Sequence, residues 1–349
     1  MELAPFVVCP ETLGPLDRRE DGFWSPQAEK LYPTKQGLVF MVYPQQDQEM
    51  IAATMLEERG HQGLGDDVAR RNLEYLRKAA PRAADFISVT RRYAGASDRT
   101  PRAVELGSGN GWVSWLLAEA GFDTWMCDFE ANTLLTGMNL KHANLPEGRR
   151  FVTDARFAPF ESGSFDLVVF KEFVHHVEAF TPLFREANRL LRPGGTVAMV
   201  EPVRSLSRSV RELKTPDPHE GHHITWPDRY LRGLRTAGFE IVHEQPVYDD
   251  QGNTKPPMAW MKKRAIAAID DQHPSGDWVS KLQLRVFGGA QLMMIGQKVR
   301  DLPIVPRPSM NVIDPESVIA TETVPAPYEE FPTVLRSAAA GFAAPSVSG

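Results

Sequence analysis

The feature that most constrains the fold of this chain is the segment VELGSGNGW at residues 104–112, which has three glycines at alternate positions. The apolar pair Ala103 and Val104 leads into it, and the apolar residues after Trp112 have the spacing of a helix. Glycine lets the backbone turn sharply and approach a ligand closely. The segment therefore predicts a strand, a ligand-binding turn and a helix, in that order.

Acidic residues come at the ends of four successive apolar segments that are predicted as strands. These strands, with a fifth after them, cover residues 103–106, 123–127, 150–153, 165–170 and 196–201. The acidic residues at the first four ends are Glu105, Asp128, Asp154 and Glu172. Ligands bind at this edge of an open parallel sheet, and Asp128 follows Gly111 by 17 residues, about the spacing of a ribose-binding carboxylate. The pattern predicts a doubly wound α/β fold that binds a ribose-containing ligand.

Residues from about 100 to 202 resemble the class I S-adenosylmethionine (SAM)-dependent methyltransferases. The segments that carry the resemblance occur in the order VELGSGNGW, MCDFE, VTDARFAPFESGSFDLVVFKEFVHHV and LFREANRLLRPGG. The resemblance implies an α/β, doubly wound, Rossmann-like sheet of seven strands. It also implies SAM as the cofactor, S-adenosylhomocysteine as the product, and direct in-line transfer of the methyl group to an acceptor.

The same resemblance implies which residues hold the cofactor. The amino-acid part of SAM is expected at Glu105, Gly107, Ser108, Gly109 and Gly111, the ribose hydroxyls at Asp128, and the adenine at Phe129, Asp154 and Ala155. Lys171 joins this set because the methyl group of SAM points toward the end of the fourth strand in this fold.

Dinucleotide-dependent dehydrogenases are the main alternative for a glycine-rich loop. Their fingerprint is Gly-x-Gly-x-x-Gly. Here the third glycine, Gly111, comes one residue early, and Trp112 stands where that glycine belongs. No second nucleotide-binding half is visible, so the methyltransferase interpretation is favoured.

The resemblance implies that the chemistry lies beyond the fourth strand. Enzymes that methylate exocyclic amines of nucleic-acid bases carry an Asn/Asp-Pro-Pro-aromatic motif there, whereas this chain has Phe170, Lys171, Glu172 and Phe173. Lys171 and Glu172 are catalytic candidates, because an adjacent Lys and Glu can orient an acceptor hydroxyl or amine and Glu172 can accept its proton. The alternative is a local ion pair at the start of a helix.

Histidines are the other catalytic candidates, since methyl transfer to oxygen or nitrogen often needs a proton removed near neutral pH. His175 and His176 are expected on a helix after the fourth strand, where one histidine usually packs against the sheet. In the segment PHEGHH at 218–223, the best-placed proton acceptors are His219 and His223. A divalent metal is the alternative use of this cluster, but no fixed metal signature matches and no metal site is predicted.

Residues 1–45 are expected to form a small β-rich ribbon. The pattern CPETLGPL…GFWSPQAEKLYPTKQGLVFMV resembles the zinc ribbon that occurs alone as a methyltransferase activator subunit and fused ahead of some bacterial methyltransferases. Its zinc-binding members have two cysteine pairs, whereas this chain has Cys9 and Thr12 for the first pair and Ser25 and Ala28 near the second. One thiolate cannot make a four-ligand site, so no zinc is expected. The residues expected to hold the ribbon are Phe6, Phe23, Trp24, Leu31, Tyr32 and Phe40. The alternative is a plain hairpin extension.

Three further regions complete the expected domain organisation. Residues 46–98 form a helical lid or linker, whose glycine-rich break at 60–65 suits either a mobile lid or an ordinary surface loop. Residues 99–300 form the methyltransferase domain, with an insert at about 250–288 that either caps the acceptor pocket or fills a core or dimer contact. Residues 301–349 form a Pro/Ala-rich tail that wraps the domain or stays disordered.

Composition bounds the location and the partners. No apolar stretch approaches the ~20 residues that span a bilayer, no signal peptide opens the chain, and only Cys9 and Cys127 are present. We therefore expect a cytoplasmic protein without a membrane partner. The net charge of −6 disfavours general attraction to nucleic acid.

Three functions from different classes follow. The leading one is SAM-dependent methylation of a small-molecule acceptor on oxygen, nitrogen or carbon. An RNA methyltransferase is second, because some ribosomal-RNA guanine methyltransferases carry an N-terminal zinc finger, although the missing cysteines and the acidic charge disfavour it. A non-catalytic scaffold that binds SAM or a partner methyltransferase is third, and the intact Glu105, Asp128 and Asp154 disfavour it. A homodimer is compatible with all three.

Overall fold

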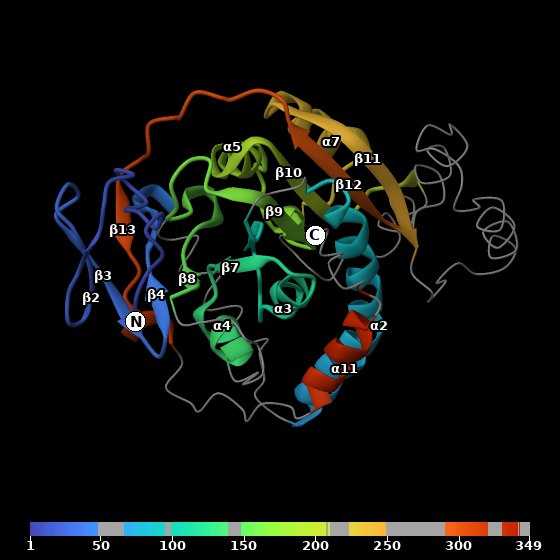
Figure 1. Ribbon diagram of the computed structural model, residues 1–349, viewed down its shortest axis with the longest axis horizontal. Helices are drawn as coiled ribbons and strands as arrows, with labels where there is room; N and C mark the ends of the chain where they lie inside the picture. Colours follow the sequence, from blue (N-terminus) through green and yellow to red (C-terminus); the bar gives the residue numbers. More distant parts are fainter. Residues whose placement is uncertain are drawn as a thin grey trace, which may run out of the picture.

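A mixed sheet of 11 strands runs through the computed structural model, which describes residues 1–47, 66–94, 99–138, 148–206, 209, 223–248, 290–319, 330–340 and 342 (Figure 1). In sheet order the strands are β1 (Asp17–Arg18), β2 (Gly22–Ser25), β3 (Lys30–Lys35), β4 (Leu38–Phe40), β8 (Arg150–Val152), β7 (Asp123–Asp128), β6 (Arg102–Leu106), β9 (Phe165–Lys171), β10 (Leu191–Pro202), β12 (Ala290–Lys298) and β11 (Phe239–Tyr248). The strands from β4 to β10 in this order are parallel, while β12 is antiparallel to both of its neighbours.

The seven strands from β8 to β11 have the arrangement expected of a class I methyltransferase sheet. From β6 the chain moves outward to β7 and β8, and then returns to the other side of β6 for β9 and β10. Such a switch point places ligands at the carboxyl ends of the strands on either side of it. The predicted doubly wound α/β fold is confirmed, and the sheet is longer than expected because β1 to β4 extend it.

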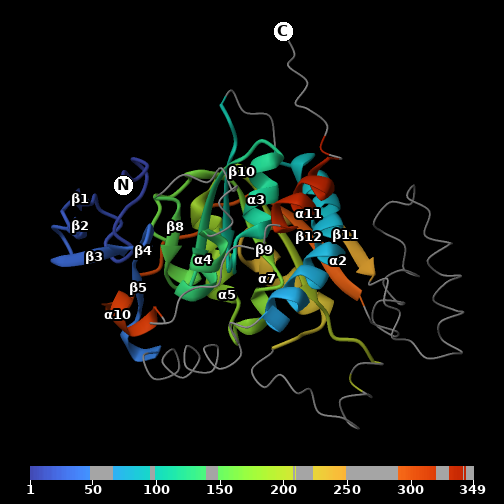
Figure 2. The ribbon, with the colours of Figure 1, turned by 90° about the horizontal axis from the view of Figure 1, so that it is seen from below.

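Helices cover both faces of this sheet (Figure 1, Figure 2). On one face lie α2 (Asp66–Arg91), α3 (Trp112–Glu119) and α11 (Glu330–Ala339), and on the other lie α5 (Thr181–Leu190) and α7 (Pro227–Thr236). In β6, Ala103 packs with the first group and Val104 with the second. Side chains of a strand alternate between its faces, and both faces are apolar here because both are covered.

The N-terminal strands β1 to β4 continue the central sheet. β4 pairs in parallel with β8. Before β1, Val7 makes an isolated antiparallel bridge to Phe160. Phe6, expected in the ribbon core, packs edge-on against Trp125 and Phe165, with ring centroids 5.0 and 5.7 Å away. The ribbon therefore shares its aromatic core with the sheet.

The C-terminal region contains regular structure where the sequence predicts only an extended tail. After β12 the chain crosses to the N-terminal strands, where β13 (Met310–Val312) pairs with β5 (Val42–Pro44) and α10 (Pro315–Val318) follows (Figure 1, Figure 2). Further along, α11 packs on α2, and Leu335 of α11 is buried. Short elements of this kind gain their stability from the surfaces they cover rather than from their own pattern.

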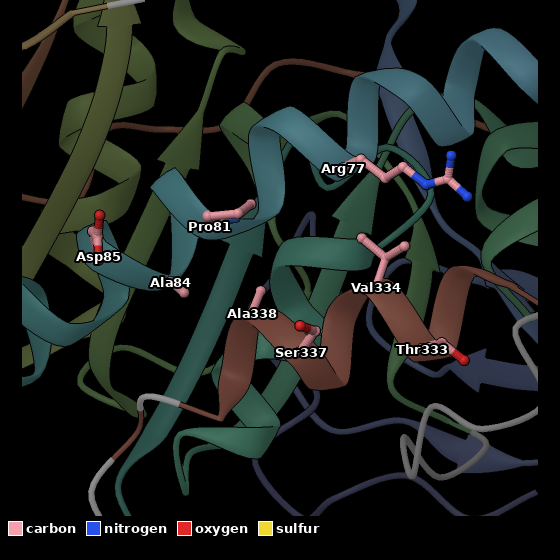
Figure 3. A pocket seen from close by; sticks show the side chains of 8 residues that line it. All are labelled: Arg77, Pro81, Ala84, Asp85, Thr333, Val334, Ser337 and Ala338. Carbon is pink, nitrogen blue, oxygen red and sulfur yellow. The ribbon is translucent and has the colours of Figure 1, made fainter. Parts of the chain in front are cut away.

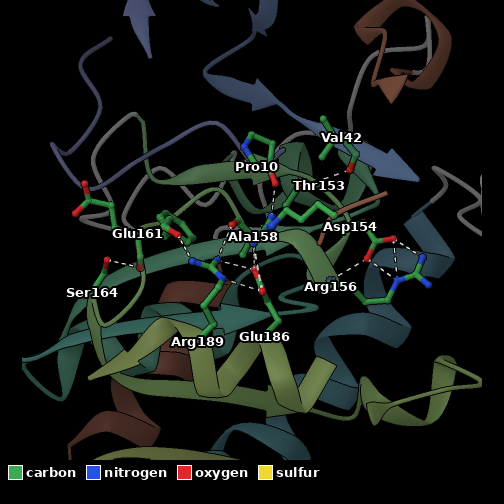
Figure 4. Close-up of polar contacts among 12 residues, drawn as sticks. Pro10, Val42, Thr153, Asp154, Arg156, Ala158, Glu161, Ser164, Glu186 and Arg189 are labelled. Atoms are coloured by element: carbon green, nitrogen blue, oxygen red, sulfur yellow. Dashed lines mark hydrogen bonds and ion pairs between the residues drawn. The ribbon is translucent and has the colours of Figure 1, made fainter. Parts of the chain in front are cut away.

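A buried ion cluster joins the N-terminal segment, the central sheet and the C-terminal segment (Figure 4). Arg189 on α5 pairs with Glu186 at 2.6 Å and donates to the carbonyl oxygens of Ala158 and Phe160. Arg307, from the segment that crosses to the N-terminal strands, also pairs with Glu186 and donates to the carbonyl oxygen of Pro10. Charges are stable at such burial only when each has partners, so this cluster ties the N-terminal and C-terminal segments to the sheet.

Several expectations lie outside the described residues, among them the part of the helical lid at 48–59, the glycine-rich break at 60–65 and the insert at 250–288. Within the described ranges, no helix is both long and apolar enough to cross a membrane.

Candidate cofactor and acceptor site

The glycine-rich loop adopts backbone conformations that favour glycine. Gly107, Gly109 and Gly111 have φ values of 74°, 53° and 78°, and Gly111 precedes the first turn of α3. The N–H groups of Gly107 and Ser108 donate to the carbonyl oxygen of Cys127 on β7, at 2.9 and 3.1 Å. A Cβ atom on Gly107 would lie 2.0 Å from the Phe173 ring. The loop is therefore held tightly between the ends of β6 and β7.

Ser108 carries an orphaned polar group inside this loop. The residue is 5% exposed, and its Oγ has no hydrogen-bond partner among the described residues. Buried hydroxyl groups normally have a partner. An unpartnered hydroxyl in a glycine cradle is the feature expected where a polar ligand group completes the site.

Glu105 lies buried under the loop at the end of β6. Its Oε2 accepts a hydrogen bond from Ser114 Oγ at 2.5 Å, and the residue is 2% exposed. Burial raises the pKa of the Glu105 carboxyl to about 8, although the hydrogen bond from Ser114 lowers it. A cationic group bound nearby would favour the ionised form of this carboxyl.

Asp128 is held by backbone donors at the end of β7. Its carboxylate accepts hydrogen bonds from the N–H groups of Gly109 at 2.7 Å and Glu130 at 2.9 Å. Burial raises the pKa of Asp128 to about 6, against the lowering effect of these hydrogen bonds. The predicted neighbours Glu105, Asp128 and the glycine loop thus meet at one edge of the sheet.

The expected adenine residues lie beside the N-terminal segment. The ring of Phe129 meets that of Tyr43 on β5 edge to face, with centroids 6.4 Å apart. The carboxylate of Asp154 is paired with Arg156 at 2.6 Å (Figure 4), and Ala155 is buried. Tyr43 and Arg156 are absent from the sequence-based site, because nothing in their local pattern marks them.

Lys171 and Glu172 form a local ion pair, the expected alternative to a catalytic role, with Nζ 2.5 Å from Oε1. Glu172 has a φ of 54°, which is strained for a residue with a side chain. Its carboxylate also accepts from the Tyr75 hydroxyl at 2.6 Å and from the Gln291 amide. A small recess beside it has Arg82 on its α2 wall.

The Glu172 carboxyl is a weak base in this setting. Burial raises its pKa, but the charge and hydrogen bond of Lys171, with hydrogen bonds from Tyr75 and Gln291, outweigh burial and lower the pKa to about 2. A general base works best with a pKa near the working pH. Its contacts suit Glu172 to orienting neighbouring groups rather than to removing a proton.

His175 lies in a 3-10 turn, η3 (Val174–His176), and not on the helix that the sequence predicts. It is buried at 6% exposure, and its Nδ1 lies 2.7 Å from Oε2 of Glu201 at the end of β10. His176 is exposed. His223 is exposed as well, and its N–H donates to the carbonyl oxygen of His175 at 2.6 Å. His219 lies outside the described residues.

Comparison with known proteins identifies the family. Residues 73–244 match the family described as "Methyltransferase domain". The ubiquinone biosynthesis O-methyltransferase of Methylococcus capsulatus is 30% identical over 180 residues, which are 49% of this chain and 74% of that protein. The chain belongs to the methyltransferase family. SAM is the cofactor of this family.

Other relatives are matched over a smaller share of their own length. Phosphoethanolamine N-methyltransferase 3 of Arabidopsis thaliana is 26% identical over 257 residues, 67% of this chain and 51% of that protein, so the chain spans about half the length of that relative. Among solved structures, phosphoethanolamine N-methyltransferase 2 of Haemonchus contortus, in complex with phosphomonomethylethanolamine and S-adenosylhomocysteine, has 21% identity and a TM-score of 0.42. That match covers 62% of this chain and 52% of the solved one.

A groove of about 840 Å³ lies between α2 and α11 (Figure 3). It is lined by Arg77, Pro81, Ala84 and Asp85 from α2 and by Thr333, Val334, Ser337 and Ala338 from α11. None of the predicted site residues lines it, so its size does not make it the candidate site.

Three of the positions compared above with zinc ligands, Cys9, Thr12 and Ser25, lie close together in this protein. Cys9 is buried, and its Sγ lies 3.1 Å from the Tyr32 hydroxyl. Burial raises the pKa of the Cys9 thiol, but hydrogen bonds with Ser25, Thr12 and Tyr32 outweigh it and lower the pKa. Within the described ranges, no group of three or more His, Cys, Asp and Glu side chains is arranged to hold a metal. The absence of zinc stays a prediction.

Proposed function

We propose that this protein transfers the methyl group of SAM to a small-molecule acceptor. The observation that carries the proposal is the cradle at the ends of β6 and β7. It combines three glycines with positive φ, the unpartnered hydroxyl of Ser108, and the buried carboxyls of Glu105 and Asp128. SAM fits this donor set, since it has an ammonium group, a carboxylate and two ribose hydroxyls. When bound, it would supply a methyl group on a positively charged sulfur. The acceptor's lone pair would attack the methyl carbon in line, and the sulfur would leave as S-adenosylhomocysteine.

The residues of the cradle divide the cofactor between them. The unpartnered hydroxyl of Ser108 faces the carboxylate of the amino-acid part, while Glu105 balances its ammonium group. Asp128 accepts hydrogen bonds from the ribose hydroxyls, because its backbone donors fix the carboxylate and leave lone pairs for a ligand. Phe129 flanks the adenine, and Asp154 and Ala155 border its edge. Preorganised donors and acceptors of this kind raise the rate mainly by positioning.

His175 is our leading candidate for the group that removes the acceptor's proton. A carboxylate can only accept a hydrogen bond, so Glu201 holds the hydrogen of the neutral ring on Nδ1 and leaves the lone pair on Nε2. Glu172 has too low a pKa for this task, and with Lys171 it orients the acceptor instead. His223 stays a second candidate, since its N–H binds the carbonyl oxygen of His175.

A small acceptor is supported by the names of the relatives, which are phosphoethanolamine and ubiquinone-biosynthesis methyltransferases. The net charge of −6 also supplies no general attraction for RNA. On this proposal the chain comprises a β ribbon at 1–45, a helical lid at 46–98, the methyltransferase domain at 99–300 and a C-terminal tail at 301–349.

Calorimetric titration with SAM and with S-adenosylhomocysteine tests the proposal. We expect micromolar binding of both, lost in Asp128→Ala and kept in the control Asp123→Ala, which changes the opposite end of the same strand. Protein that binds is then incubated with methyl-labelled SAM and either a small-molecule cell extract or total RNA. Label in the small-molecule fraction is expected. No binding of either ligand overturns the proposal, and label confined to RNA overturns the small-molecule acceptor.

A further inference from the structure

The purine end of the proposed cofactor site borders residues from far upstream in the chain. Tyr43 lies on β5, and its ring meets that of Phe129 at 6.4 Å and 85°. Both side chains are half-buried, so each keeps surface that a ligand can cover. Two flat apolar rings that meet edge to face make a corner suited to a third aromatic ring.

The position of Tyr43 is fixed on both sides by backbone hydrogen bonds. The carbonyl oxygen of the preceding residue, Val42, accepts from the N–H of Asp154 at 3.0 Å. On the other side, Tyr43 is the register partner of Asn311 in β13. The C-terminal segment therefore holds β5 against the loop that carries Asp154, and the ring of Tyr43 is placed by the fold rather than by its own flexibility.

A second link runs from the N-terminal segment to Asp154 itself. The guanidinium of Arg156 donates to both carboxylate oxygens of Asp154, through Nε at 3.0 and 3.1 Å and Nη2 at 2.6 Å. Nη2 also donates to Asp47 Oδ2 at 2.6 Å. With the backbone N–H of Arg156 at 2.8 Å, three donor groups converge on a carboxylate that has about four acceptor positions. About one acceptor position is left for a ligand donor.

From these contacts we infer that the N-terminal segment supplies part of the adenine subsite. Tyr43 is a second aromatic wall beside Phe129. Arg156 is a positioning residue, which is braced by Asp47 and aims the remaining lone pair of Asp154 at the exocyclic amine of adenine. The inference rests on the proposed function, because it requires SAM to bind with its adenine at Phe129 and Asp154.

The aromatic wall is tested with S-adenosylhomocysteine and with 5′-methylthioadenosine, which lacks the amino-acid end. Tyr43→Ala is expected to weaken both ligands by the same factor, about 5- to 10-fold, while Tyr43→Phe stays within about 2-fold of the wild type. Tyr93→Ala is the matched control, since Tyr93 is also half-buried against another ring, that of His243. Thermal unfolding checks that each variant folds, and Tyr43→Leu replaces Tyr43→Ala if that variant does not.

The positioning role of Arg156 is tested by base discrimination, which a purely structural role would not change. Wild-type protein is expected to bind 5′-methylthioadenosine about 10-fold or more tighter than 5′-methylthioinosine, which has an oxygen in place of the amine. Arg156→Met is expected to shrink this ratio to below about 3-fold, and Asp47→Asn to shrink it partly. Arg149→Met is the matched control, because Arg149 pairs with Asp123 at a similar exposure, 24% against 22%.

The outcomes separate this inference from the proposed function. If the wild-type protein binds both ligands and Tyr43→Ala binds them with the same affinity, the aromatic wall is overturned. It is also overturned if Tyr43→Ala weakens the binding of S-adenosylhomocysteine but not of 5′-methylthioadenosine. An unchanged base preference in Arg156→Met overturns the positioning role. If the wild-type protein binds neither S-adenosylhomocysteine nor 5′-methylthioadenosine, the proposed function fails and the adenine subsite fails with it.

Discussion

The imidazole Nδ1 of His175 lies 2.7 Å from Oε2 of Glu201, and the same carboxylate accepts from three successive backbone N–H groups. These N–H groups belong to Phe173, Val174 and His175, at 2.9, 2.8 and 3.4 Å. Glu201 is fully buried at the end of β10. One carboxylate therefore shapes the turn after β9 and fixes the ring of our leading proton acceptor.

Loss of the Glu201 carboxylate should lower the free energy of unfolding. Glu201→Ala leaves three buried N–H groups and an imidazole without their acceptor, which is expected to lower the free energy of unfolding by about 3 kcal/mol. Urea denaturation measures the change. The control is Glu240→Ala, which removes an exposed glutamate of β11 and should stay within about 0.5 kcal/mol. Equal stability of the two variants would contradict the role of Glu201.

Stability of the ligand-free protein should fall as the pH rises from 5 to 8. The folded-state pKa values of about 8 for Glu105 and about 6 for Asp128 lie above the ordinary values of 4.5 and 3.8. The folded protein therefore holds more protons than the unfolded chain in this range, and stability declines toward higher pH. Glu105→Gln is expected to flatten the decline in denaturation curves recorded across the range. A slope identical to that of the wild type and of the control Glu240→Gln would refute this assignment.

Gly107 should tolerate a side chain far less well than another glycine with positive φ. Gly107→Ala combines the left-handed conformation with a Cβ 2.0 Å from the Phe173 ring, and should lower the free energy of unfolding by about 3 kcal/mol or more. Gly121 has a φ of 90°, and a Cβ atom added there would meet none of the described residues within 4 Å, so Gly121→Ala should lower it by about 1–2 kcal/mol. Chemical denaturation of both variants gives the comparison, and a smaller loss at Gly107 would contradict the clash.

The ion cluster on α5 should make the C-terminal segment essential to stability. Arg307→Met removes a partner of Glu186 and the donor to the Pro10 carbonyl, and is expected to lower the free energy of unfolding by about 2–3 kcal/mol. Urea denaturation is again the measurement. Arg18→Met, at an exposed arginine of β1, is the control and should change little. No difference between the two variants would show that the segment is held by its apolar contacts alone.

The ribbon should contain no stoichiometric zinc. Cys9 is hydrogen-bonded to Tyr32 and lies beside the hydroxyl groups of Ser25 and Thr12, which are poor ligands for a structural zinc. Elemental analysis of the purified protein provides the test. One zinc per chain would overturn this expectation and imply ligands that the sequence does not mark.

Local sequence predicted most of the central sheet and part of the site. The proximity of the glycine loop, Glu105 and Asp128 could be predicted, because the carboxyl ends of parallel strands meet at one edge of the sheet. The partners of Glu172 could not, since Tyr75 and Gln291 come from positions 97 and 119 residues away. Contacts at such separations leave no periodic signal in either segment.

The sequence by itself determined the doubly wound fold and the glycine cradle, because these depend on short motifs and on apolar periodicity, and its ordered segments resemble those of the methyltransferase family. Only the tertiary structure decided that β4 extends the sheet, that the C-terminal segment pairs with β5, and that Glu201 holds His175. Each of these depends on side chains and strand edges that meet only after the chain has folded. The physical reason is that burial and hydrogen bonding are satisfied across the whole molecule, while propensity and spacing act over a few residues.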